Sequence, residues 1–432
     1  MNSETIHIPQ SIRFSCSGCG NCCLSWPVPL TAADRERIER LDFENLKISS
    51  CSKSHLRSLN SRDARLDAFA HTLEKDFDGR CQFLTQDNRC VLHASCGESA
   101  KPSMCSLFPF SFCKTPDGIH AYVSFASSAV LLNSGELLSS QSKLLSEKWQ
   151  LFQSLYPGVQ SDWSSLQLVD GLNTTFADFI ALEQSFLEDF CPSEVEDALP
   201  GHRASREQDL VFSSQDISPC PVACATKPIE ETLFESSSTI ASALPPTVNA
   251  EAIPPLESSP SIVDQLLLKH MDRFYFPSDI FRSGPAGFDA RALMEEIVQA
   301  PDTVLFGSGS TATPLSKLAE LPGGALSEKI DDLLRRFVYC RLFARLYCGP
   351  SLAHLSVLSG FHHLLFLVVL IKLKIKDHIR LAGSIDFPAA AEYVRSAERR
   401  LSQLSLSRQT ASVWEVLFLS PARAERVLTF FK

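Results

Sequence analysis

Four cysteines stand close together near the start of the chain, and their spacing suits metal chelation. They form a C-x2-C-x2-C-C pattern at Cys16, Cys19, Cys22 and Cys23. Thiolates bind zinc and iron, and two-residue gaps allow a turn to direct consecutive sulfurs towards one point. The glycines between them permit the backbone angles of such a turn. This N-terminal cysteine segment (residues 16–23) makes the first third of the chain a candidate metal centre.

A hairpin is expected to add two more thiols. Cys81 and Cys90 flank Thr85 to Asn88, whose residue types favour a turn between two apolar strands. With a four-residue loop, Phe83 would lie opposite Cys90, and Cys81 would share a sheet face with Cys90 because strand side chains alternate. The two thiolates would then reach the same side of the hairpin.

Cys105 completes the predicted ligand set. It follows Lys101-Pro102, which we expect to form a turn that orients Cys105, since proline fixes the backbone angle. The seven predicted metal ligands are Cys16, Cys19, Cys22, Cys23, Cys81, Cys90 and Cys105. His93, Cys96 and Cys113 are further candidates.

The number of metal sites stays open at this point. One tetrahedral zinc or one cubane iron–sulfur cluster uses four ligands, so seven thiols are too many for one site and nearly enough for two. Adjacent side chains point apart, so Cys22 and Cys23 need not serve the same ion. One site with spare or redox-active thiols is the alternative. Thiolates suit both zinc and an iron–sulfur cluster, and spacing does not separate the two.

Composition narrows the class of protein. The chain has 432 residues, 44% of them apolar, and a net charge of −10. Its acidic balance argues against a nucleic-acid-binding protein, which would show a basic face. The first ten residues lack the basic and apolar regions of a signal peptide. We therefore expect a cytoplasmic protein, in which clustered cysteines indicate metal binding or catalysis more often than disulfides.

The pattern of elements predicts an α+β fold, with a small cysteine-rich domain of short strands followed by a mainly helical region. Thr31 and Asp34 predict a capped helix that runs through Leu41. A second helical stretch is expected at about Ser61 to Asp76, and a strand from Gly118 to Ala126.

The remainder of the chain divides by composition. Residues 131–191 are expected to be a helical extension, residues 192–260 a flexible Pro/Ser-rich linker that carries Cys220 and Cys224, and residues 261–432 a helical domain. Residues 1–130 would be the metal-binding domain.

Within the helical domain, several residues need a chemical or a structural interpretation. The apolar segment from 364 to 371 is shorter than the roughly twenty residues of a membrane span, so a buried helix and no stable membrane insertion are expected. A helix through Leu342 is expected to end at Gly349-Pro350. Four arginines on this stretch indicate a solvated face, with contact to a carboxylate or an acidic partner as the alternative. The nearby His362-His363 are typical of core or surface positions, and Cys340 and Cys348 of small core residues. The arginines are Arg335, Arg336, Arg341 and Arg345.

Several cysteine motifs in order resemble the zinc- or iron-chelating cysteine-cluster family, also called the CxxCxxCC family. The motifs are Phe14-x-Cys16-x2-Cys19-Gly20-x-Cys22-Cys23, Cys81-x-Phe83-Leu84, Cys90-x2-His93 and Lys101-Pro102-x2-Cys105-x2-Phe108-Pro109-Phe110. The resemblance covers about residues 12 to 130. It implies one more cysteine after the last strand of the domain, where this chain has Ala126-Ser-Ser.

In its size and its helical C-terminal half, the chain is similar to flagellin lysine-N-methylases within that family. This similarity implies a methyltransferase that uses S-adenosylmethionine and acts on lysine side chains of a protein partner. The alternative is a non-catalytic protein, either stapled by its metal or carrying it, with a helical module that binds a partner.

Overall fold

The protein is described by a computed structural model. It covers residues 5–24, 28–41, 56–58, 68–73, 75–76, 79–157, 162–192, 227–244, 260–277, 288–299, 301–307, 311–321, 328–402, 404 and 406–430. Short strands in the N-terminal third are followed by helices, which confirms the predicted α+β class. The expectations for Cys220, Cys224 and residues 61–67 lie outside the described residues.

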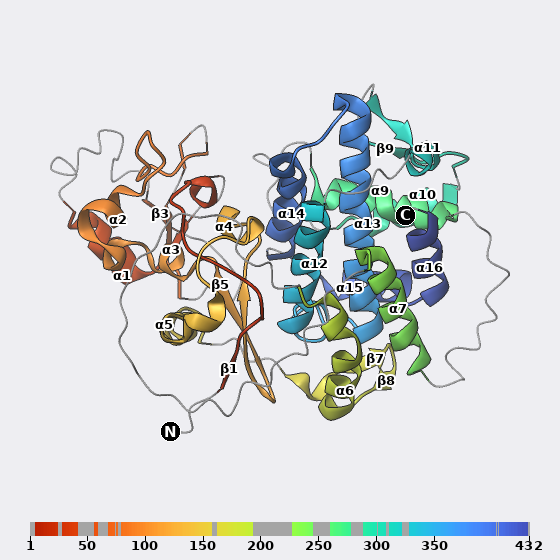
Figure 1. The fold of residues 1–432 in the computed structure, drawn as a ribbon, viewed down its shortest axis with the longest axis horizontal. Coiled ribbons are helices and arrows are strands. Elements are labelled where there is room, and N and C mark those ends of the chain that lie inside the picture. Colours follow the sequence, from red (N-terminus) through yellow and green to blue (C-terminus); the bar gives the residue numbers. More distant parts are fainter. Residues whose placement is uncertain are drawn as a thin grey trace.

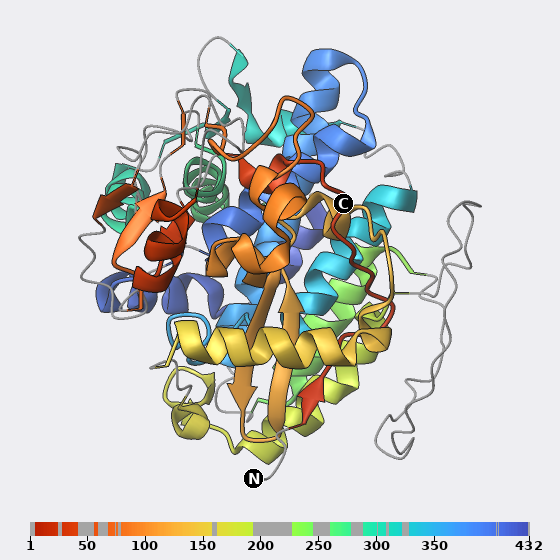
Figure 2. The same ribbon diagram turned by 90° about the vertical axis from the view of Figure 1, so that its left-hand side faces the viewer.

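Two small sheets organise the N-terminal third. In the first, β6 lies between β1, which is parallel to it, and β5, which is antiparallel. Helix α5 crosses this sheet (Figure 2), with Trp149 and Phe152 packed against Phe112. The second sheet has the order β2-β4-β3. The strands are β1 (Ile6–His7), β2 (Val28–Leu30), β3 (Leu56–Ser58), β4 (His71–Leu73), β5 (Phe110–Thr115) and β6 (Gly118–Val123).

The helices of this third are short, except for α5. The predicted capping box is present at the start of α1, where Thr31 accepts from the Asp34 N–H and Asp34 accepts from the Thr31 N–H. The helices are α1 (Ala32–Glu39), α2 (Val91–Cys96), α3 (Ser103–Leu107), α4 (Ser128–Leu131) and α5 (Ser142–Leu155). The helix expected up to Asp76 is wrong at residues 71–73, because both edges of β4 pair with neighbouring strands.

Helix α13 (Val357–Ala382) is the centre of the C-terminal region, with the other long helices around it (Figure 1). Among the described helices it alone is long and apolar enough to cross a membrane, with a mean hydropathy of 1.7 over 18 residues. Of that window, 94% is buried inside the protein, so α13 is a core helix here, as expected.

The surrounding elements have the following bounds. They are α6 (Phe176–Leu187), α7 (Ile229–Ser242), α9 (Ile262–Tyr275), α10 (Ala290–Gln299), α11 (Leu315–Glu320), α12 (Glu328–Phe343), α14 (Phe387–Ser402), α15 (Arg408–Phe418) and α16 (Pro421–Phe430). Two small hairpins join β7 (Gln167–Val169) to β8 (Leu172–Asn173) and β9 (Leu305–Phe306) to β10 (Thr313–Pro314).

The interval expected to be a linker contains a structured helix. Ile229, Leu233 and Ile240 of α7 are fully buried, and α7 packs against α13 and α16. The expectation of a flexible linker is therefore wrong for residues 229–242. The apolar face of α7 lies within a stretch that is otherwise rich in Ser, Pro and Glu, and packing against α13 determines its structure.

The arginines expected to form a solvated face are buried instead. Their exposed fractions are 4% for Arg335, 2% for Arg336, 4% for Arg341 and 3% for Arg345. Helix α12 ends at Phe343, before the expected stop at Gly349, so Arg345 and Cys348 lie in the following turn. Each guanidinium has carbonyl or carboxylate acceptors on other elements. Such partners allow a charged group to be buried.

Candidate metal centre

Four of the predicted ligands come together from three separate segments. Cys23 ends a one-turn helix (Asn21–Cys23), Cys81 and Cys90 flank the hairpin, and Cys105 lies in α3. Negative charge on Cys81, Cys23 and Cys90 acts on the Cys105 thiol, and charge on Cys23 and Cys90 acts on the Cys81 thiol. We call these four residues the four-thiol corner.

The hairpin reaches this arrangement by a different route from the expected one. Leu84, not Phe83, lies opposite Cys90, because the loop closes between Thr85 and Arg89 at 2.9 Å. A turn from Cys81 to Leu84 interrupts the first strand, and Cys90 is the N-cap of α2. The expected Phe83–Cys90 pairing is therefore wrong, and so is the second strand after Cys90. The turns, and not a shared sheet face, bring the two thiols together.

Burial disfavours the charged form of two of these thiols, Cys81 and Cys105. It raises the pKa of Cys105 strongly and that of Cys81 to a smaller extent, and neighbouring thiolates add to both effects. Lys75 acts in the opposite direction on both pKa values, and its Nζ donates to the Cys23 carbonyl at 2.7 Å. A bound metal ion would favour deprotonation, because thiolates are its ligands.

The donor set of the four-thiol corner fits zinc or an iron–sulfur cluster, both of which take four cysteine ligands. No three of the described thiols have sulfurs within 4.8 Å of one another. A metal would therefore have to draw the sulfurs closer together. The assignment of ligands stays a prediction on these grounds.

The remaining thiols of the N-terminal cysteine segment are placed differently. Cys16 is exposed, and its charge acts on Lys101. Burial alone would raise the pKa of Cys19, but hydrogen bonds from Ser128, the Asn21 N–H and Ser17 lower it, as does nearby Arg395. The side chain of Cys22 lies outside the described residues.

The further candidates do not join the four-thiol corner. The His93 side chain is 51% exposed, with its Nε2 3.6 Å from a Glu98 oxygen, and Cys96 is exposed. Cys113 is buried, with its sulfur 3.3 Å from the Ser351 hydroxyl, and burial raises its pKa to about 11. Near the expected place of the missing family cysteine, the Ser128 hydroxyl accepts from Nδ2 of Asn21 in the N-terminal cysteine segment at 3.0 Å.

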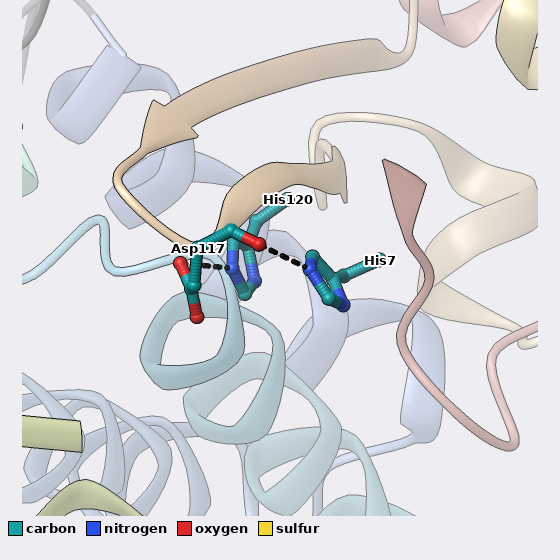
Figure 3. A group of neighbouring side chains, drawn as sticks. All are labelled: His7, Asp117 and His120. Atoms are coloured by element: carbon teal, nitrogen blue, oxygen red, sulfur yellow. Dashed lines mark hydrogen bonds and ion pairs between the residues drawn. The ribbon is translucent and has the colours of Figure 1, made fainter. Parts of the chain in front are cut away.

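A second group of possible ligands was not expected from the sequence. His7, Asp117 and His120 place their ligand atoms within 4.8 Å of one another (Figure 3). Parallel pairing of β1 with β6 sets His7 beside His120, and the two rings stack with centroids 4.6 Å apart. No local spacing signals this group, because it depends on strand pairing between distant residues.

The guanidinium of Arg345 already binds the atoms of this second group that a metal ion would use. Arg345 donates to the two Asp117 oxygens at 2.6 and 2.9 Å, and its Nη1 lies 3.0 Å from Nε2 of His120. Burial alone would raise the pKa of Asp117, but hydrogen bonds from His120 and Arg345 hold this pKa well below its usual range. A metal ion would need the same lone pairs. This group therefore acts as an ion-pair connection between the sheet and the helical region.

Comparison with known proteins agrees with the cysteine pattern. Neither the curated proteins nor the solved structures include a match to this chain. Residues 15–128 match the family model CxxCxxCC, whose description is "Putative zinc- or iron-chelating domain". The matched range includes the N-terminal cysteine segment, the hairpin and α3, and therefore all members of the four-thiol corner. Residues 15–128 are therefore similar to the CxxCxxCC family of zinc- or iron-chelating domains.

Proposed function

We propose that this protein binds one metal centre in the four-thiol corner, through Cys23, Cys81, Cys90 and Cys105, and that the metal staples the N-terminal domain together. The observation that carries the proposal is the convergence of these four thiols from three segments separated in sequence. Cys16, Cys19 and Cys22 remain candidates for a second position. When bound, zinc would supply a rigid tetrahedral link, and an iron–sulfur cluster would add electron transfer.

The packing around the corner supports a stapling role. A small hydrophobic cluster lies beside it, separate from the main core, and Cys81 and Cys90 pack against it. Its buried members are Leu30, Ile38, Leu73, Phe83, Leu92 and Ala100. A core of this size contributes little stability by itself, and small domains are often completed by a metal or by disulfides.

The test is the metal content and acid-labile sulfide of the full-length protein purified without oxygen. Iron with matching sulfide would identify a cluster, and zinc without sulfide a structural site. Cys81→Ser and Cys105→Ser should each lower the metal content markedly, because serine is a poor ligand for these metals. Cys96→Ser is the matched control, since Cys96 is an exposed cysteine of the same domain outside the corner. Unchanged metal content in the first two variants would contradict the proposed ligands.

Methyl transfer to lysine, the use of S-adenosylmethionine, a lysine-bearing protein partner and a cytoplasmic location stay predictions. The family match concerns metal chelation by residues 15–128 and does not extend into the helical region. Binding of S-adenosylmethionine by the metal-loaded protein, followed by a methylation assay on cell extract, tests the enzymatic prediction. Absence of both would favour the non-catalytic, metal-stapled alternative.

A further inference from the structure

One member of the four-thiol corner reaches it from a helix of its own. The chain neighbours of Cys23 and Cys81, Leu24 and Arg80, form an antiparallel backbone bridge, and the hairpin carries the third thiol. The fourth, Cys105, lies instead in α3. Its position therefore depends on what holds the start of α3.

The start of α3 is capped from another helix. Its N-cap residue, Pro102, makes no side-chain cap bond. Oδ1 of Asp34, in α1, accepts from the N–H of Ser103 at 3.0 Å and from the Ser103 hydroxyl at 2.8 Å. The first N–H groups of a helix have no partner within it, and a side-chain oxygen commonly satisfies them. Asp34 supplies that oxygen to α3 from 69 positions earlier in the chain.

The Asp34 carboxylate is buried, and the residue is 0% exposed. Its Oδ2 accepts from the Thr31 N–H at 3.1 Å, as part of the capping box of α1. Its Oδ1 also accepts from Nη2 of Arg37 at 2.5 Å, and the same Nη2 donates to the Lys101 carbonyl at 2.8 Å. Helix α1 therefore holds the chain on both sides of Pro102.

These bonds go beyond what α1 needs for its own start. The capping box uses one carboxylate oxygen, Oδ2, while Oδ1 serves the segment that leads into α3. A carboxylate can be buried only when donors surround it, so the position of Ser103 is tied to that of Asp34. Cys105 follows Ser103 by two residues in the same helical turn. A shift of Ser103 would therefore move the Cys105 sulfur, whereas metal–ligand distances vary by only about 0.2 Å.

We propose that Asp34 is a positioning residue for the metal centre: by holding Ser103, it sets the direction from which the Cys105 sulfur approaches the ion, and it does not touch the ion itself. This inference rests on the proposed function and gives α1 a role in that site. By thermodynamic linkage, whatever Asp34 contributes to metal affinity, metal binding contributes equally to the docking of α1 on α3.

The test uses the full-length protein, freed of metal under reducing conditions, with Zn²⁺ and Co²⁺ as probes. Competition with a chromophoric chelator measures Zn²⁺ affinity, and the thiolate-to-Co²⁺ absorption reports the geometry of the site. In Asp34→Asn an amide NH₂ replaces one oxygen, so a donor faces either the Thr31 N–H or the donors of Ser103. Loss of an outer support of a metal ligand costs about 10- to 100-fold in affinity, so this variant should weaken Zn²⁺ binding by that factor and change the Co²⁺ spectrum. Ser103→Ala, which loses only the hydroxyl bond, should have the same effects to a smaller extent.

Hydrogen exchange separates positioning from a purely structural role. In the wild type, Zn²⁺ should slow backbone exchange in α1 as well as in α3, because Asp34 links the two helices. In Asp34→Asn, Zn²⁺ should still slow exchange in α3 but no longer in α1. If Asp34 only stabilised α1, the variant would exchange faster to the same degree with and without Zn²⁺, and that result would overturn the proposal.

Two variants serve as controls. Thr31→Ala weakens the cap of α1 but leaves the Asp34 carboxylate bonded to Ser103, because the oxygen that it removes accepts from the Asp34 N–H. It should keep the wild-type Co²⁺ spectrum and the effect of Zn²⁺ on α1. Asp178→Asn makes the matched change at the same position of α6, where Thr175 accepts from the Asp178 N–H at 3.1 Å. Asp178 is exposed and lies outside the N-terminal domain, so this variant should leave the affinity unchanged.

The two proposals fail in different ways. Wild-type Zn²⁺ affinity and Co²⁺ spectrum in both Asp34→Asn and Ser103→Ala would overturn the positioning role, while the four-thiol corner would stand. If Asp34→Asn does not fold, Ser103→Ala decides the question, because it leaves the capping box of α1 intact. Metal content in Cys81→Ser and Cys105→Ser equal to that of the wild type would overturn the proposed function itself.

Discussion

Removal of the buried Glu398 carboxylate should strongly destabilise the contact between the N-terminal sheet and the helical region. Glu398 of α14 is 1% exposed and accepts from Nη2 of Arg341 at 2.5 Å. It also accepts from the hydroxyls of Tyr122 and Ser124 on the sheet side, both at 2.8 Å. One carboxylate therefore pairs with α12 and with the segment around the end of β6.

The magnitude follows from what Glu398→Ala leaves behind. The side chain of Arg341 is 5% exposed, so the variant contains a buried guanidinium without its carboxylate. Breaking a buried ion pair in this way costs about 3–5 kcal/mol. The lost bonds from Tyr122 and Ser124 belong to the same carboxylate, and their contributions are not additive to that figure. We therefore expect the free energy of unfolding to fall by about 3–5 kcal/mol.

Urea unfolding followed by far-ultraviolet circular dichroism measures this change. Glu295→Ala is the control, because the Glu295 side chain is 58% exposed in an ion pair with Arg291 and should change the free energy of unfolding by less than about 0.5 kcal/mol. In the double variant Arg341→Met/Glu398→Leu, apolar groups replace both charges, and most of the lost stability should return. A loss below about 1 kcal/mol in Glu398→Ala would refute the reasoning, since a buried unpaired guanidinium cannot cost so little.

Three further predictions follow from local geometry. Gly20→Ala should lower the free energy of unfolding by over about 1 kcal/mol more than Gly18→Ala does, and it should also lower metal affinity more. Both residues have positive φ, but only at Gly20 would a new Cβ lie 2.8 Å from Cβ of Asn88. Thr31→Ala should cost about 1 kcal/mol, measured by thermal unfolding, because α1 loses its N-cap. The folded-state pKa of Asp117 is lowered, so its contribution to stability is present above its unfolded pKa and is lost as the pH falls through the folded value. Asp117→Asn should therefore lower stability at pH 7 and make acid unfolding less steep, whereas a stability unchanged at pH 7 would contradict the ion-pair role.

Local features of the sequence were sufficient for several elements. Thr31 and Asp34 predicted the capped start of α1, and the long apolar run predicted the core helix α13. The α+β order followed from the same kind of pattern. These predictions depend on residues within one or two turns of one another, so the chain itself contains the relevant interactions.

The candidate ligands were also predictable as residue types, while their grouping was not. The sequence identifies seven thiols, but the structure brings Cys23, Cys81, Cys90 and Cys105 together and places Cys19 against Ser128. The hairpin register differs by one residue from the expected one, because a five-residue loop closes it. A single added loop residue changes which side chains face each other.

Tertiary structure alone decided the environment of the charged residues. The sequence by itself determined that four arginines lie in and just after α12, and their charge predicted a solvated face. In the structure, Arg341 pairs with a glutamate 57 positions later, and Arg345 with an aspartate 228 positions earlier. Whether a charge can be buried depends on acceptors that the fold brings to it from distant parts of the chain, and local periodicity carries no information about them.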